Sequence, residues 1–164
     1  MITQDIDARA RRVLDACRGR GLRLATAESC TGGLVAGALT EIAGSSDVVD
    51  RGFVTYSNDA KRDMLGVPAE TLARHGAVSR ESAKAMARGA LVNSGADLAV
   101  AVTGIAGPGG GSADKPVGLV HFAAAARDGR VVHRERRFGD VGRREVRLKS
   151  VVEALALLEE LATG

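Results

Sequence analysis

Aromatic residues are nearly absent from this 164-residue chain, which has no tryptophan, one tyrosine and three phenylalanines. The core must therefore be built from aliphatic side chains, and apolar residues do make up 45% of the sequence. The scarcity also argues against binding of single-stranded nucleic acid, because such proteins usually stack the bases on aromatic rings.

Cysteines and long apolar runs are also scarce. Cys17 and Cys30 allow at most one disulfide, so we expect both thiols to be free in a reducing cytoplasm. No stretch approaches the roughly 18 apolar residues of a membrane span, and the N-terminus lacks the apolar segment of a signal peptide. These absences predict a cytoplasmic protein with no membrane partner.

Basic residues gather toward the C-terminal end, although the net charge is only +3. Between Arg127 and Lys149, nine Lys or Arg face four Asp or Glu. Such a patch suits an anionic ligand, which could be a small phosphate, a membrane surface or a nucleic acid, and a solvated face is the equal alternative. The length fits one domain spanning residues 1–164.

Helices and strands alternate along most of the chain. Hydrophobic spacing and capping residues predict helices over 5–18, 31–42, 68–75, 79–93 and 141–162, with a short helix capped by Asn58. Apolar or alternating runs predict strands over 22–27, 51–57, 96–103, 117–126 and 131–138, the last two joined by an Asp-Gly turn. This order predicts an α/β fold, a single layered domain with a mixed sheet flanked by helices.

Ser29 lies between the predicted strand 22–27 and the helix that follows it. A hydroxyl at such a corner is close to helix N–H groups that have no intrahelical partner and can stabilise an oxyanion. Gly32 and Gly33 would let a substrate approach the backbone closely. These features suggest a serine nucleophile. The Gly-x-Ser-x-Gly pattern of serine hydrolases is absent, however, and a serine that only caps the helix is the simpler alternative.

Lysine is rare here, with four Lys against 19 Arg. Because Arg cannot lose its proton and a buried Lys can, Lys61 is a candidate base for a serine nucleophile, with Tyr56 as proton relay or orienting partner. The three histidines suit this role poorly, and no spacing of His, Cys and Asp resembles a metal site. An exposed surface lysine is the alternative, and Ser57 is a rival nucleophile.

Two further segments suit a ligand. The glycine-rich loop 103–111 follows a predicted buried strand, and its N–H groups could bind a phosphate or a carboxamide, unless it is only a flexible connection. Arg143 and Arg147 share a face near the start of the last helix, where they oppose the helix dipole. An anion-binding site would produce this local conflict, and ordinary surface arginines explain it equally well.

Several segments, taken together, resemble the CinA C-terminal domain family, the nicotinamide-nucleotide amidases. The matching segments occur in the family's order and are Thr26-Ala27-Glu28-Ser29-Cys30-Thr31-Gly32-Gly33, Gly44-Ser45-Ser46, Gly52-Phe53-Val54-Thr55-Tyr56-Ser57-Asn58 with Ala60-Lys61, Thr103-Gly104-Ile105-Ala106-Gly107-Pro108-Gly109-Gly110, Lys115-Pro116-Val117-Gly118 and Arg143-x-x-Val146-Arg147. They cover nearly the whole chain. One departure is the segment 139–143, which is longer than the family's Gly-Asp-Arg turn.

The resemblance implies a deamidase that converts nicotinamide mononucleotide into nicotinate mononucleotide and ammonia in pyridine nucleotide recycling. It implies Ser29 as nucleophile, Lys61 and Tyr56 in its activation, no metal and no cofactor. The substrate-binding residues that it implies are Cys30, Thr31, Gly32, Gly33, Ser45, Asn58, Thr103, Gly104, Gly107, Gly109, Arg143 and Arg147.

A homodimer is expected as well, with a small-molecule nucleotide as substrate and no nucleic acid partner. The alternative to the enzyme is a non-catalytic nucleotide-binding or regulatory module in which Ser29 only caps a helix.

Overall fold

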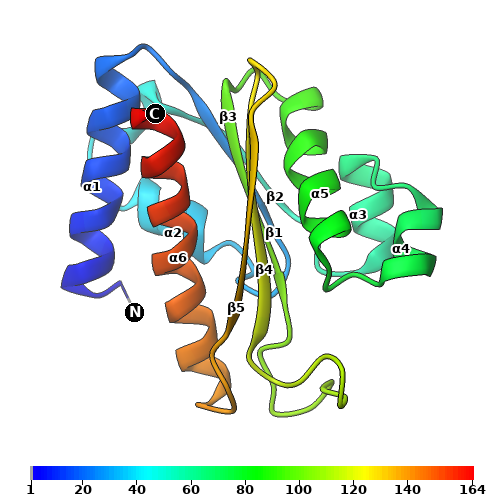
Figure 1. The fold of residues 1–164 in the computed structure, drawn as a ribbon. Helices are drawn as coiled ribbons and strands as arrows, with labels where there is room; N and C mark the ends of the chain where they lie inside the picture. The colour runs from blue at the N-terminus through cyan, green and yellow to red at the C-terminus, as the bar shows by residue number, and fades with distance from the viewer. Residues whose placement is uncertain (1) are drawn as a thin grey trace.

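The computed structural model describes residues 2–164, which form a five-stranded sheet between two layers of helices (Figure 1). The strands are β1 (Leu24–Glu28), β2 (Val49–Val54), β3 (Leu98–Gly104), β4 (Leu119–Ala126) and β5 (Val131–Arg137). The helices are α1 (Gln4–Gly19), α2 (Leu34–Thr40), the short 3₁₀ turn η1 (Ser45–Asp47), α3 (Asn58–Leu65), α4 (Ala69–His75), α5 (Arg80–Val92) and α6 (Arg143–Thr163). The predicted α/β fold, with a mixed sheet flanked by helices, is confirmed.

The sheet has the strand order β2-β1-β3-β4-β5. Strand β1 runs parallel to β2 and β3, whereas β4 is antiparallel to both β3 and β5. Because parallel strands need long crossover connections, α2 joins β1 to β2, and α3 to α5 join β2 to β3. The carboxyl ends of β1, β2 and β3 meet at one edge of the sheet, where ligands commonly bind in α/β proteins.

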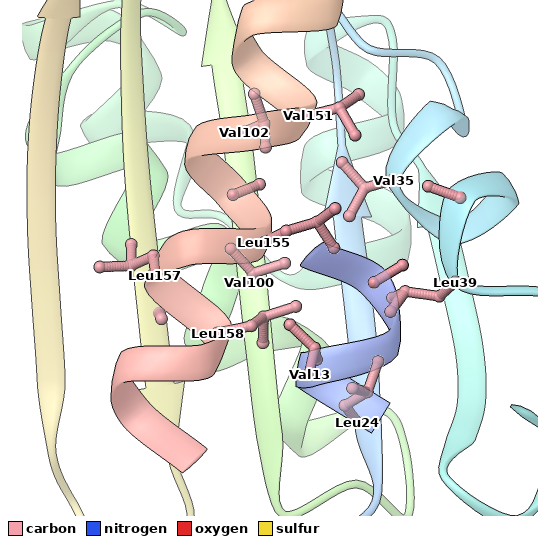
Figure 2. Packing of buried hydrophobic residues seen from close by; sticks show 14 of the residues in the cluster. Val13, Leu24, Val35, Leu39, Val100, Val102, Val151, Leu155, Leu157 and Leu158 are labelled. Atoms are coloured by element: carbon pink, nitrogen blue, oxygen red, sulfur yellow. The ribbon is translucent and has the colours of Figure 1, made fainter. Parts of the chain in front are cut away.

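The two faces of the sheet are packed differently. Helices α1, α2 and α6 cover one face, where Val100 of β3 packs with Val13 and Leu158 in the larger cluster (Figures 1 and 2). The other face presents alanines, among them Ala99 and Ala101, to the layer that contains α5. The aliphatic core expected from the scarcity of aromatic residues is therefore confirmed.

Two predicted helix starts were wrong, and the reasons are local. The helix expected from residue 31 begins at Leu34, because Gly32 and Gly33 have φ values of +56° and +106° that a right-handed helix cannot contain. The N-cap of α3 is Ser57 rather than Asn58: its hydroxyl accepts a hydrogen bond from the N–H of Ala60, and Asn58 is already helical.

The expectation of two free thiols is confirmed within residues 2–164. Cys17 and Cys30 are free thiols, and both are buried. None of the helices in this range is long and apolar enough to cross a bilayer.

Candidate active site

A pocket of about 270 Å³ opens where β1, β2 and β3 end. Its lining comes from the turn after β1, the connection from β2 into α3, the linker before α5, the loop after β3 and the start of α6. The lining residues are Ser29, Cys30, Tyr56, Asn58, Lys61, Ala77, Val78, Thr103, Gly104, Ile105, Ala106, Gly107, Gly109, Gly110 and Arg143. The volume lies near the lower end of the roughly 300–1,000 Å³ typical of small-molecule sites.

Ser29 and Lys61 are in contact in this pocket. The Nζ atom of Lys61 lies 2.9 Å from the Oγ atom of Ser29, although 32 positions separate them in the sequence. Only 1% of Lys61 is exposed, so the alternative of a surface lysine is wrong. A serine hydroxyl beside a buried amine is one of the arrangements that can generate a nucleophile.

The surroundings of Lys61 favour a neutral amine. Its Nζ donates to the carbonyl of Thr55 at 2.9 Å and approaches the carbonyl of Tyr56 at 3.4 Å. Burial lowers the pKa of Lys61 from its ordinary value, and no carboxylate within residues 2–164 forms an ion pair with it. A neutral amine has two N–H groups for these carbonyls and one lone pair. The lone pair can then accept the proton of Ser29.

Cys30 also lines the pocket, directly after Ser29. Burial raises the pKa of its thiol to about 12. The thiolate is the nucleophilic form of cysteine, and burial disfavours it at Cys30. Lys61 contacts the hydroxyl of Ser29, whereas it forms no hydrogen bond with the Cys30 thiol.

Glu28 holds the turn that carries Ser29, a role that residue spacing does not predict. The residue ends β1 and is 1% exposed. One carboxylate oxygen accepts from the hydroxyl of Thr31 at 2.6 Å and from the N–H of Val35 at 2.9 Å, and the other accepts from the N–H of Ala36 at 3.0 Å. These N–H groups open α2, so the free helix donors expected beside Ser29 are already satisfied. The available signal was a charged residue at the end of an otherwise uncharged, buried strand.

Other backbone donors follow Ser29 directly. The N–H of Ser29 donates to the carbonyl of Val102, and the N–H of Gly32 donates back to the carbonyl of Ser29. The N–H groups of Cys30 and Thr31, in contrast, have no acceptor in the described part of the chain. Of the two residues, Cys30 lines the pocket and Thr31 does not, so the N–H of Cys30 is the donor that an oxyanion formed at Ser29 can use.

Arg143 and Arg147 lie on one face of α6 but have different surroundings. The guanidinium of Arg143 donates to the carbonyl of Gly107 and to the hydroxyl of Tyr56, both at 2.8 Å, and so links two sides of the pocket. The guanidinium of Arg147 donates to the carbonyls of the two residues after Ser29, at 3.0 and 3.3 Å. Arg147 is not among the pocket-lining residues.

The side chains of Tyr56 and Ser57 form hydrogen bonds with groups other than Ser29 and Lys61. The hydroxyl of Tyr56, a 59% exposed residue, bonds to Arg143, and the atom that Tyr56 presents to Lys61 is its backbone carbonyl. The hydroxyl of Ser57 caps α3. Ser29, unlike the rival Ser57, has its hydroxyl against the Lys61 amine.

The remaining predicted binding residues divide into two groups. The structure places six in the pocket lining: Cys30, Asn58, Thr103, Gly104, Gly107 and Gly109. Four others do not line it: Thr31, Gly32, Gly33 and Ser45, the last of which is buried in η1. Thr103 also ties the pocket to the linker before α5, because its hydroxyl donates to the carbonyl of Ala77 at 2.8 Å.

The basic C-terminal segment is partly neutralised. Four of its arginines form ion pairs with carboxylates: Arg130, Arg134, Arg136 and Arg137. Across residues 2–164, no group of three or more His, Cys, Asp or Glu side chains is arranged to hold a metal ion.

Comparison with known proteins gives one consistent result. The model of the CinA C-terminal domain matches residues 6–162. The nicotinamide-nucleotide amidohydrolase PncC of Enterobacter agglomerans is 55% identical over 141 residues, which cover 85% of each chain. A CinA-like protein of Synechococcus sp. is 56% identical over 155 residues, but the present chain spans only 37% of its length.

A solved structure agrees with these relatives. That of the competence/damage inducible protein CihA from Agrobacterium tumefaciens superposes with a TM-score of 0.97 at 64% identity, covering 98% of both chains.

Proposed function

The chain belongs to the CinA C-terminal domain family, and from this premise we propose that it hydrolyses nicotinamide mononucleotide to nicotinate mononucleotide and ammonia. The observation that carries the proposal is the 2.9 Å contact between the buried Lys61 amine and the Ser29 hydroxyl. The amidohydrolase name of the Enterobacter relative supports the choice of a carboxamide as the bond to be cleaved.

In the proposed reaction, the Oγ atom of Ser29 attacks the carboxamide carbon while Lys61 accepts the hydroxyl proton. The carbonyl oxygen becomes an oxyanion that the N–H group of Cys30, a pocket-lining residue, stabilises, and such a donor is worth about 2.7–4 kcal/mol in comparable sites. Lys61 then delivers its proton to the nitrogen, the C–N bond breaks and ammonia leaves. Water, deprotonated by Lys61, hydrolyses the resulting ester and regenerates Ser29.

Arg143 is the proposed contact for the phosphate of the nucleotide. It lines the pocket, and its guanidinium donates to two neutral acceptors, the Gly107 carbonyl and the Tyr56 hydroxyl. An anionic phosphate can take the place of these acceptors and form stronger, charge-assisted hydrogen bonds. Tyr56 then orients Arg143 rather than relaying a proton. The loop from Thr103 to Gly109, together with Asn58, surrounds the rest of the ligand.

An ammonia-release assay on nicotinamide mononucleotide tests this proposal. Ser29→Ala is expected to abolish turnover and keep nucleotide binding. The matched control, Ser57→Ala, removes a helix cap worth about 1 kcal/mol but leaves turnover intact. Full turnover by Ser29→Ala, or its loss in Ser57→Ala alone, contradicts the assignment.

The competing hypothesis, a non-catalytic nucleotide-binding module, has a distinct signature in the same assay. It predicts that the pure protein binds pyridine nucleotides and releases no ammonia from them. The homodimer and the cytoplasmic location stay predictions, which light scattering and cell fractionation test.

A further inference from the structure

The turn after Ser29 is held by two charged side chains: Glu28, which directly precedes Ser29, and Arg147, which lies far along the chain in α6. Glu28 binds the Thr31 hydroxyl and the start of α2. From α6, the Nε atom of Arg147 donates to the Cys30 carbonyl at 3.0 Å, and its Nη2 atom donates to the Thr31 carbonyl at 3.3 Å. The guanidinium also packs on the turn itself, because a Cβ atom added at Gly32 would lie 3.4 Å from Nη2.

Because a peptide group is planar, holding its carbonyl also sets the direction of its N–H. The Cys30 carbonyl belongs to the same peptide group as the N–H of Thr31, and in a trans peptide the two point in opposite directions. By fixing the carbonyl, Arg147 therefore fixes the direction of the N–H. A cation on the carbonyl also polarises the peptide and strengthens the N–H as a donor.

We propose that Arg147 is a positioning residue: by holding the Cys30 and Thr31 carbonyls it fixes the backbone of the turn that carries Ser29, and it does not bind the nucleotide. Glu28 anchors the same turn from the other side through the Thr31 hydroxyl. This inference rests on the proposed serine mechanism. It assigns Arg147 a role different from the substrate contact implied by the family resemblance, and the two roles have opposite kinetic signatures.

Steady-state kinetics of Arg147→Ala separates the two roles. A positioning residue predicts a kcat reduced by at least tenfold, toward the roughly 10²–10³-fold cost of a lost oxyanion donor, with KM changed by less than about twofold. Guanidinium chloride at millimolar concentration should restore part of kcat, because the free cation can occupy the vacated position. A raised KM with unchanged kcat would instead show that Arg147 binds substrate and overturn the inference.

Arg144→Ala is the matched control, since Arg144 is an exposed arginine of the same helix turn and lies outside the pocket lining. It should change neither parameter. A second pair serves if Arg147→Ala folds poorly. Thr31→Val removes the hydroxyl that Glu28 binds and should lower kcat more than Thr31→Ser, which keeps that hydroxyl. Equal kcat values in Thr31→Val and Thr31→Ser contradict the proposed anchoring.

A second readout separates failure of this inference from failure of the proposed function. A fluorophosphonate phosphorylates an activated serine: the Oγ–P bond forms, fluoride leaves, and Lys61 takes the proton. If the wild type releases no ammonia but is labelled at Ser29, the substrate assignment fails while Arg147 can still be judged. Slower labelling of Arg147→Ala than of Arg144→Ala supports the inference, and equal rates refute it.

Discussion

Replacing Lys61 with Met tests the chemistry most directly, because methionine keeps the length of the side chain and removes the amine. The lost contact with Ser29 removes the proposed general base, and a general base typically contributes 10²–10⁴-fold to the rate. At about 1.36 kcal/mol per factor of ten, kcat/KM should fall by an amount equivalent to roughly 2.7–5.4 kcal/mol. The carbonyl of Thr55 also loses its donor, a cost of about 1–3 kcal/mol.

The variant should therefore stay folded at room temperature, since domains are typically stable by about 5–15 kcal/mol. Its midpoint of thermal unfolding should fall by about 2–4 °C for each kcal/mol of stability lost. Ammonia release measures the rate, and calorimetry measures the unfolding. If Lys61→Met keeps turnover within about tenfold of the wild type while Ser29→Ala abolishes it, Lys61 is not the base.

The pH dependence of the same pair gives an independent check. The folded-state pKa of Lys61 is lowered by burial, so the native protein releases this proton at a lower pH than the unfolded chain does. Between the two pKa values the unfolded state binds more protons, and wild-type stability should rise with pH relative to Lys61→Met. The rate should rise as the pH passes up through the lowered folded-state pKa and level off above it, because the amine must be neutral to act as base. A wild-type-minus-variant stability that does not change with pH would contradict the shifted pKa.

Two further predictions concern stability. Gly89→Ala should destabilise the protein by about 1–3 kcal/mol, because the added Cβ atom would collide with the carbonyl oxygen of Leu65. Gly37→Ala in α2 is the control: its Cβ atom would meet nothing within 4 Å, so the change should be neutral or stabilising. Chemical denaturation of both variants measures the difference. His121 and His133 lie 2.9 Å apart between ring nitrogens, and burial lowers the pKa of both. Below about pH 6.5 the unfolded chain therefore binds more protons at these histidines than the native state does. The free energy of unfolding should fall as the pH drops from about 6.5 through the lowered pKa values of the two histidines. His133→Gln should reduce that loss of stability, which a thermal melt at about pH 5.5 measures.

The architecture could be predicted from the sequence because its periodic signals agree with one another. The apolar run in β3, the Asp-Gly turn between β4 and β5 and the stripe on α6 each have one sensible interpretation. The exact element ends could not be predicted where two good candidates adjoin. Ser57 and Asn58 are both favoured N-caps, and only the backbone conformation, extended at Ser57, decides between them.

The candidate site was predictable in part. The rarity of lysine drew attention to Lys61, but its contact with Ser29 depends on the neighbouring parallel strands β1 and β2 ending at one edge. Glu28 leaves one signal, a charged residue at the end of a buried strand, but its partners, among them N–H groups of α2, leave none in the residue spacing. The role of Arg147 could not be predicted, because its partners are backbone carbonyls of the turn. Arg143 and Arg147 have the same spacing signal, and tertiary packing alone separates them.

The contact between Arg147 and the Ser29 turn links the beginning of the chain to its end, across 117 and 116 positions. During synthesis, β1, β2 and α3 leave the ribosome long before α6 does. Until then, the turn after Ser29 lacks the guanidinium that contacts it, and the core lacks the side chains of α6, among them Leu155 and Leu158. A protein cut before residue 143 would have the same deficit.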